Sequence, residues 1–323
     1  MDTFPLIAIG VASTSLDGEI LAIRYTKIVS LNDQKDEFES LDSLYQQMEK
    51  EDSDFSKLTK KEGQIVKERE KLIVHKINED TPVEDVKDAY LKLHLLSMKL
   101  VKPNTINLEG IFSALPNVAW TNQGPIHPND FEKLRPEYDT LYIRSLDKFP
   151  CLTDYVIPNG VRIADSSRVR LGAYLSEGTT IMHEGFVNFN AGTLGPSMIE
   201  GRISAGVIVG KNSDLGGGCS TMGTLSGGND VKISVGQDCL LGANSGLGIP
   251  LGDRCIVEAG LYLTAGSKVE VLDKDNKLVK TIKASELSSQ DDQLFIRNSL
   301  TGAIQCKPNT KEVSLNDQLH TND

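Results

Sequence analysis

One short stretch of the chain carries a carboxylate and a guanidinium two residues apart, Glu200 and Arg202. A carboxylate beside an attacking amine can take its proton or can itself accept an acyl group. A guanidinium fork binds a carboxylate through two parallel hydrogen bonds. Such a pair is a candidate for acid–base or acyl-transfer chemistry on a ligand that carries a carboxylate. Taken alone, each residue would more simply be a solvated surface charge.

Histidines and cysteines offer little other chemistry. The five histidines never occur as HxxxH or HxH, and the five cysteines never occur as CxxC. These spacings argue against a histidine-rich metal site, a zinc ribbon or a disulfide framework, and we expect buried free thiols. His183 is an alternative base, because an imidazole titrates near neutral pH. We expect a structural or interface role for it.

Charge and hydropathy exclude whole classes of partner. The 323 residues contain 34 Lys and Arg against 45 Asp and Glu, a net charge of −11, with no basic stripe. Nucleic-acid binding needs such a stripe. No apolar run approaches the about 20 residues of a membrane span, and the first residues lack the pattern of a signal peptide. We expect a cytoplasmic protein that binds neither nucleic acid nor membrane.

The glycines and aliphatic residues of the middle third follow a repeat. Of 28 glycines, 22 lie between Gly160 and Gly266. Aliphatic residues recur there every six positions, which fits neither a helix nor a simple strand but suits a short strand plus a bend. Three such units make a coil, and about six stacked coils predict a parallel β-helix. The row comprises Ile163, Val169, Leu175, Ile181, Val187, Thr193, Ile199 and Ala205; then, after a four-residue step, Val209, Leu215 and Thr221; then Val235, Leu241, Leu247, Leu251, Val257, Leu263 and Val269.

The flanks predict a mixed N-terminal region. Residues 1–30 read as two strands around a turn at Asp17 and Gly18, and residues 34–72 read as mostly helical. Residues 81–84 fit a capping box, followed by a helix whose apolar face is Val86, Tyr90, Leu93 and Leu100. We expect a mainly β chain with an α/β N-terminal domain (1–110), a connecting segment (111–159), the β-helix (160–269) and C-terminal strands with a tail (270–323).

Several motifs together resemble one family. They are residues 198–210 (MIEGRISAGVIVG), 214–218 (DLGGG), 222–228 (MGTLSGG), 240–246 (LLGANSG) and 257–262 (VEAGLY), extended by 183–195 (HEGFVNFNAGTLG) and 295–299 (FIRNS). This set resembles the tetrahydrodipicolinate N-succinyltransferases, in their actinobacterial-type branch of the hexapeptide-repeat acyltransferases. The resemblance implies a left-handed β-helix and a homotrimer with active sites between subunits. It also implies transfer of a succinyl group from succinyl-CoA to tetrahydrodipicolinate, giving N-succinyl-2-amino-6-oxopimelate in diaminopimelate and lysine synthesis.

The resemblance also assigns site residues. Glu200 matches the family's proposed catalytic residue, described as forming an acyl anhydride, although a general-base role is physically simpler. The positions that match succinyl-CoA contacts are Arg202, Gly217, Ser220, Ala243, Glu258, Ala259, Gly266, Lys283, Phe295, Ile296, Arg297 and Asn298. Lys283 and Arg297 suit the CoA phosphates, and Ile296 stands where the family commonly has a second arginine. We also expect N–H groups of residues 216–218 to stabilise an oxyanion.

A magnesium site is the least complete part of the resemblance. Glu184 matches a glutamate that binds Mg²⁺ between subunits, but the companion aspartate is replaced here by Ser167. Losing a carboxylate weakens a site for a hard cation. Any metal held there would be structural or activating.

Two other readings remain open at this point. The chain could acylate a different amine. Residues 222–230 and the N-terminal domain, which should shape the acceptor site, would distinguish this case from the first. It could instead be a non-catalytic β-solenoid that scaffolds or trimerises, although Glu200 and Arg202 argue against that. A γ-type carbonic anhydrase is excluded because the repeat contains His183 and no other histidine.

Overall fold

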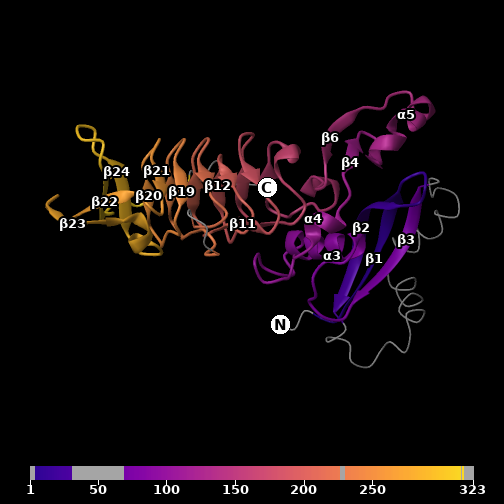
Figure 1. The fold of residues 1–323 in the computed structure, drawn as a ribbon, viewed down its shortest axis with the longest axis horizontal. Helices are drawn as coiled ribbons and strands as arrows, with labels where there is room; N and C mark the ends of the chain where they lie inside the picture. The colour runs from indigo at the N-terminus through magenta and orange to yellow at the C-terminus, as the bar shows by residue number, and fades with distance from the viewer. Residues whose placement is uncertain (1–3, 31–68, 226–229, 314, 316–323) are drawn as a thin grey trace. The chain divides into compact units, whose positions relative to one another are not determined.

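The computed structural model describes residues 4–30, 69–225, 230–313 and 315. The chain forms two compact units, the first made of residues 1–92 and 107–149 and the second of residues 93–106 and 150–323 (Figure 1). The predicted division into four segments remains a prediction. No helix within the described ranges is long and apolar enough to cross a bilayer.

The first unit contains two small antiparallel sheets. One has the order β2-β1-β3, from β1 (Leu6–Thr14), β2 (Ile20–Ser30) and β3 (Glu70–Ile77). The other has the order β5-β4-β6, from β4 (Val118–Thr121), β5 (Gly124–Ile126) and β6 (Ile143–Asp147). The predicted hairpin is confirmed, and Gly18 takes φ +86° in its turn. Most of the helix expected over residues 34–72 lies outside the described residues, while residues 70–72 belong to β3.

Helix α3 (Val86–Ser97) begins later than the sequence predicted. The Asp85 carboxylate accepts hydrogen bonds from the N–H groups of Lys87 (2.8 Å) and Asp88 (3.1 Å), which are two of the unpaired donors of the first turn. The capping box at residues 81–84 was therefore wrong. Tyr90 and the following apolar residues are buried as expected, but Leu100 lies beyond the helix and is 52% exposed. The short helices are α4 (Ile111–Ala114), α5 (Phe131–Leu134), η1 (Pro128–Asp130), η2 (Arg135–Glu137), η3 (Leu152–Asp154), η4 (Ser166–Arg168) and η5 (Ala284–Leu287).

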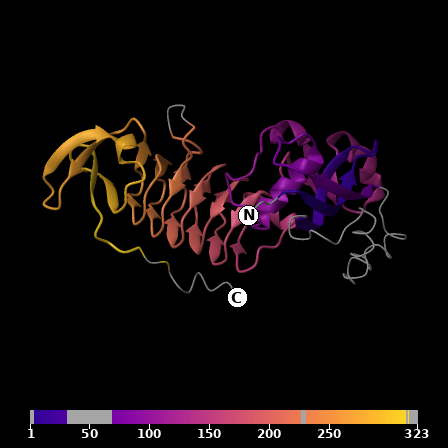
Figure 2. The same cartoon turned by 90° about the horizontal axis from the view of Figure 1, so that it is seen from below.

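The second unit is a stack of parallel-stranded coils (Figures 1 and 2). Its three sheets have the orders β7-β9-β12-β15-β18-β20, β8-β11-β14-β17 and β10-β13-β16-β19-β21. This architecture confirms the hexapeptide β-helix, while its left-handed sense remains a prediction. The strands are β7 (Arg162–Ile163), β8 (Ala173–Leu175), β9 (Thr179–Ile181), β10 (Phe186–Val187), β11 (Ala191–Thr193), β12 (Ser197–Ile199), β13 (Arg202–Ile203), β14 (Ile208–Val209), β15 (Ser213–Leu215), β16 (Ser220–Thr221), β17 (Ser234–Val235), β18 (Leu240–Leu241), β19 (Gly246–Gly248), β20 (Ile256–Val257) and β21 (Tyr262–Thr264).

The C-terminal strands continue the first of these sheets. They are β22 (Lys268–Leu272), β23 (Leu278–Lys283), β24 (Gln293–Arg297) and β25 (Ile304–Pro308). β24 pairs in parallel with β20, and the sheet then runs on through β25 and β22 to β23. The end of the β-helix is thus covered by paired strands, so its last coil does not leave an open edge on this face.

The predicted row of aliphatic residues forms the core, with one correction. Nearly all of its members are buried, and paired residues one coil apart are 16 or 18 positions apart in sequence where no insertion intervenes. Ala205 is only half-buried, whereas Ile203 is fully buried and pairs with Val187. The four-residue step therefore falls between Ile199 and Ile203. The regular spacing of six concealed it, because Ala205 is also apolar.

This correction makes a stability prediction. Ile203→Ala should lower the free energy of unfolding by about 2–5 kcal/mol, because it leaves a cavity in the core. Ala205→Gly, the matched change at the position named from sequence, should cost less than about 1 kcal/mol. Urea unfolding followed by circular dichroism measures both. A larger loss of unfolding free energy for Ala205→Gly than for Ile203→Ala would show that Ala205, not Ile203, belongs to the buried row.

Candidate active site

One corner of the β-helix repeats the same backbone arrangement on four successive coils. It is occupied by Glu200, Gly216, Gly242 and Glu258. Their N–H groups donate to the next coil at Leu215 (2.8 Å), Leu241 (2.8 Å), Val257 (2.8 Å) and Phe295 (2.9 Å). Parallel strands lie about 4.8 Å apart, so this column runs along the axis of the coils.

The next residue at this corner is different, because its N–H group has no acceptor. These residues are Gly217, Ala243 and Ala259, and none of their amides donates to any group in the described part of the chain. All three match donor-binding positions. The structure therefore brings predicted site residues into one line beside Glu200, each with an N–H group available to a ligand.

A groove of about 270 Å³ accompanies this line. It is lined by Met198, Glu200, Asp214, Gly216, Gly217, Leu240, Leu241, Gly242, Ala243 and Leu315. The Glu200 carboxylate lies over Gly217, since its Oε2 would be 3.6 Å from a Cβ at that glycine. Asp214 was missed by the sequence analysis. Its outward place in β15, between two buried residues, was the available signal.

Two kinds of glycine occur at the site. At Gly242 a Cβ would lie 2.4 Å from the Ala259 nitrogen, so the chain itself requires glycine there. At Gly266 no atom of the described residues would lie within 4 Å, and φ is outside the left-handed region. Among the described residues, neither packing nor backbone conformation demands a glycine at Gly266, so this position leaves room for close approach of a ligand.

Arg202 is held beside the groove by Ser220. The two residues pair between β13 and β16, and the Arg202 Nη2 donates to Ser220 Oγ at 2.5 Å. Arg202 is exposed, so its remaining N–H donors face solvent on the outer surface of the coil. This geometry leaves a guanidinium edge available to an anion two residues from Glu200.

The expected oxyanion site narrows to one residue. The Gly216 N–H donates to Leu241 O at 2.8 Å, and the Gly218 N–H donates to Glu200 O at 3.3 Å. Both donors are already used in the coil. The expectation for residues 216–218 as a group was therefore wrong, and Gly217 is the member whose N–H can meet a ligand.

At the far end of the column, side chains brace the backbone. The Arg297 N–H donates to Glu258 Oε2 at 2.7 Å, and Arg297 Nη1 donates to Gly302 O at 3.0 Å. The Phe295 ring is buried in the core of the β-helix. Asn298 Oδ1 accepts from the N–H groups of Leu300 and Thr301 in the following turn. The Phe295 ring is therefore not accessible to a ligand, whereas Ile296 and the backbone at this end are.

The surroundings of Glu184 do not fit a magnesium site within one chain. Its carboxylate is exposed, and the nearest charged partner is His183 Nε2 at 3.8 Å. Arg168 Nη2 donates to the Glu184 carbonyl oxygen at 2.9 Å, which places a cation where a metal would need further anionic ligands. Asp165 is bonded instead to the Ser167 backbone (2.9 Å) and hydroxyl (2.7 Å). Within the described residues of one chain, Glu184 therefore has no second carboxylate with which to share a cation.

One other cluster has the composition of a metal site. His75, Asp85 and Asp88 offer ligand atoms within 4.8 Å of one another in the first unit. Their oxygens already accept hydrogen bonds at the start of α3, and His75 Nε2 lies 2.7 Å from Asp88 Oδ1. Helix capping accounts for the cluster.

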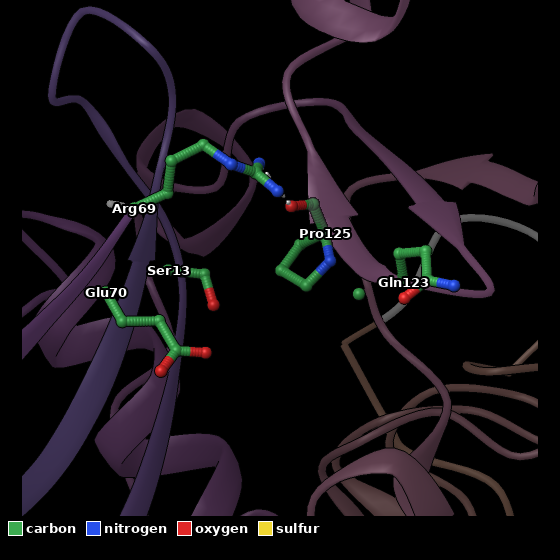
Figure 3. A pocket seen from close by; sticks show the side chains of 6 residues that line it. Ser13, Arg69, Glu70, Gln123 and Pro125 are labelled. Atoms are coloured by element: carbon green, nitrogen blue, oxygen red, sulfur yellow. Dashed lines mark hydrogen bonds between the residues drawn. The ribbon is translucent and has the colours of Figure 1, made fainter. Parts of the chain in front are cut away.

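A second, smaller pocket lies in the first unit (Figure 3). It has a volume of about 60 Å³ and is lined by Ser13, Arg69, Glu70, Gln123, Gly124 and Pro125. The Arg69 side chain reaches across it toward the Pro125 carbonyl oxygen, at 3.5 Å. No residue predicted to do chemistry lines this pocket.

Cys219 lies beside the groove but is not a nucleophile. Burial, with smaller contributions from Asp214 and Glu200, raises the pKa of its thiol to about 12. A nucleophilic cysteine requires a lowered pKa. The thiol is therefore a poor candidate nucleophile, and the carboxylate of Glu200 stays the predicted catalytic group.

Family profiles match three parts of the chain. The N-terminal profile of tetrahydrodipicolinate N-succinyltransferase matches residues 23–113, and the middle profile of the same family matches residues 115–150. A profile for the hexapeptide repeat of succinyl-transferases matches residues 232–265.

Curated relatives match over most of the chain. A 2,3,4,5-tetrahydropyridine-2,6-dicarboxylate N-succinyltransferase from Pseudomonas putida is 61% identical over 253 residues, covering 77% of this chain and 74% of the relative. The enzyme of the same name from Vibrio cholerae is 55% identical over 258 residues, 79% of this chain and 75% of the relative. These relatives leave the predicted actinobacterial-type branch untested.

A solved structure matches as well. The Campylobacter jejuni protein, described as a 2,3,4,5-tetrahydropyridine-2-carboxylate N-succinyltransferase, is 33% identical, with a TM-score of 0.81. The match covers 97% of this chain and 94% of that one.

The raised pKa of Cys219 predicts slow alkylation. At pH 8 a thiol of pKa about 12 is ionised in about one molecule in 10⁴, so iodoacetamide should modify native Cys219 far more slowly than the urea-unfolded chain. Peptide mass spectrometry measures both rates. Because the folded pKa lies above that of an ordinary thiol, reactivity should rise with pH throughout the range in which the protein stays folded. Rapid modification of native Cys219 at pH 8 would contradict the assignment.

The surroundings of Glu184 predict that a chelator changes neither the stability nor the assembly of the protein. Incubation with EDTA and gel filtration should leave the Tm and the oligomeric state unchanged, because one chain supplies one carboxylate beside a guanidinium. A drop in Tm that added Mg²⁺ reverses would show that neighbouring subunits complete the site.

Proposed function

We infer the reaction from the family to which this chain belongs, the tetrahydrodipicolinate N-succinyltransferases. The chain transfers a succinyl group from succinyl-CoA to tetrahydrodipicolinate, giving N-succinyl-2-amino-6-oxopimelate and CoA. This is a step in the succinylase branch of diaminopimelate and lysine synthesis. The observation that carries the assignment of the site is the line of available amides beside Glu200.

The donor is proposed to lie along the corner column. The pantetheine arm of CoA contains two amides, whose carbonyl oxygens need donors once water is excluded. Gly217, Ala243 and Ala259 present N–H groups about 4.8 Å apart along the axis, which supports an extended arm whose two amides meet Ala243 and Ala259 and whose thioester lies at Gly217. The thioester then lies at the Glu200 end, and the nucleotide lies toward Lys283 and Arg297.

Glu200 is proposed to handle the proton or the acyl group. After addition of water opens the ring, the acceptor nitrogen attacks the thioester carbonyl carbon, a C–N bond forms and the C–S bond breaks. The proton leaving the nitrogen passes to the Glu200 carboxylate, and the CoA thiolate takes up a proton as it departs. In the alternative, Glu200 itself accepts the succinyl group before the amine does. Both versions place the carboxylate within reach of the thioester at Gly217.

Two further groups support the transition state. The Gly217 N–H can donate to the oxygen on which negative charge develops, because no group of the described residues accepts from it. The Arg202 guanidinium, held by Ser220, can bind the terminal carboxylate of the succinyl group in bidentate fashion.

The assembly and the surroundings of the acceptor are also proposals. We propose a cytoplasmic homotrimer in which the groove of one subunit faces a neighbour, as the resemblance implies. Residues 226–229 of the loop expected to shape the acceptor site lie outside the described residues. A metal at the subunit interface is the weakest part of the resemblance, given the surroundings of Glu184.

The direct test is an assay of the purified protein. Loss of thioester absorbance from succinyl-CoA should depend on tetrahydrodipicolinate, with acetyl-CoA run in parallel. Binding of CoA without turnover would favour a different amine acceptor, and absence of both would favour a scaffold.

The carboxylate of Glu200 has its own test. Glu200→Gln should lower kcat by about 10²–10⁴-fold, because the amide can neither take the proton nor accept the acyl group. The dissociation constant of CoA, measured by calorimetry, should stay within about twofold, since amides of the corner rather than the Glu200 side chain bind the arm. An unchanged kcat would remove Glu200 from the mechanism. Asp214→Asn removes the other carboxylate of the groove, and a much smaller loss of kcat there would separate the role of Glu200 from a general loss of charge.

A further inference from the structure

Two lysines stand directly opposite each other where the C-terminal hairpin begins. In the antiparallel pair of β22 and β23, Lys268 pairs with Lys283, and both side chains are exposed. Like charges directly opposite each other on neighbouring strands destabilise a sheet. Repulsion between the two ammonium groups therefore destabilises the ligand-free chain. An anion bound between them would remove this repulsion.

The neighbouring acids accept hydrogen bonds from neutral donors rather than from either ammonium group. Neither ammonium group is ion-paired with a carboxylate of the described residues. On β22, Glu270 Oε2 accepts from Gln305 Nε2 at 2.9 Å. After β23, Glu286 Oε1 accepts from the Lys283 backbone N–H at 3.0 Å. Neither carboxylate is therefore seen to bridge the two lysine side chains.

The sheet places Lys268 between two residues implied in donor binding. Val269 of β22 pairs with Ile304 of β25, and Ile304 pairs with Arg297 of β24. The next row along the same strands is therefore Lys283, Lys268, Ala303 and Asn298, and the Asn298 N–H donates to Ala303 O at 2.8 Å. Lys283 and Asn298 are three strand spacings apart, about 14 Å. A ligand that touches both must pass Lys268.

We propose that Lys268, together with Lys283, binds a phosphate group of the acyl donor's nucleotide. This inference rests on the proposed function and adds a binding residue to it. The chain has a net charge of −11, so a polyanionic donor needs local cations. Gly266, two residues before Lys268, leaves open space beside the pair through which the donor can approach. A phosphate there turns a repulsive pair into a bidentate cation site.

Lys280 supplies the matched control. It lies on the same strand as Lys283 but an odd number of residues away, so its side chain belongs to the other face. Lys268→Gln should raise the dissociation constant of CoA about tenfold, as loss of one charge-assisted contact does, and should leave kcat unchanged. Lys280→Gln removes the same charge from the same hairpin and should change the constant by less than about twofold.

Stability provides a readout that does not depend on turnover. Without ligand, Lys268→Gln should raise the Tm, because the repulsion with Lys283 is gone, whereas Lys280→Gln should leave it unchanged. With saturating CoA, the order of wild type and Lys268→Gln should reverse, since the wild type gains more binding energy. A ligand-free Tm of Lys268→Gln at or below that of wild type would contradict the repulsive pair.

Truncated donors locate the phosphate. Calorimetry with CoA, 3′-dephospho-CoA and pantetheine compares the effect of Lys268→Gln on each. Loss of the effect with 3′-dephospho-CoA assigns the 3′-phosphate, and loss only with pantetheine assigns the diphosphate. An equal effect with pantetheine would overturn the proposal. If wild type binds CoA and Lys268→Gln binds it equally well, this inference fails and the proposed function stands; if wild type does not bind CoA, the proposed function itself fails.

Discussion

Parallel pairing between successive coils is the constraint on which the second unit depends. A single coil cannot bury its own apolar row, so each coil is stable only against its neighbours. Pairing fixes the coils about 4.8 Å apart and brings residues 16 or 18 positions apart into register. Every feature that repeats around the coil therefore becomes a line along the axis. The buried row is one such line, and the corner that carries Glu200 is another.

The chemistry of the groove follows from the alternation of amides at that corner. One residue of each corner donates its N–H to the next coil, whereas the N–H groups of Gly217, Ala243 and Ala259, each next in sequence to such a donor, have no acceptor among the described residues. A groove with donors at a regular spacing suits a long, flexible ligand with regularly placed carbonyl groups. Glu200 and Arg202 lie at one end of this line, and the lysines of the C-terminal hairpin lie toward the other. Glu200 and the hairpin lysines are thus separated along the axis, as a donor with a thioester at one end and phosphates at the other requires.

Patterns in the sequence predicted the features that depend on periodicity. They failed for features that are determined by contacts between distant parts of the chain. The row, the β-helix and the first hairpin followed from spacing. Ile203 was missed because Ala205 kept the period, and the start of α3 was missed because Asp85 rather than Thr81 caps it. The motif containing Phe295 could not reveal that its ring is buried, since only the return of β24 to β20 covers it. Asp214 lines the groove together with residues of other strands, and Lys268 pairs with Lys283 on a neighbouring strand. Spacing along one strand does not show such neighbours.

A crystal structure with bound CoA tests the central claim most directly. The account predicts that the pantetheine arm runs along the corner column, with carbonyl oxygens within about 3.2 Å of N–H groups of Gly217, Ala243 or Ala259 and with its sulfur beside Glu200. An arm bound on another face of the coils, with these amides still facing water, would contradict it.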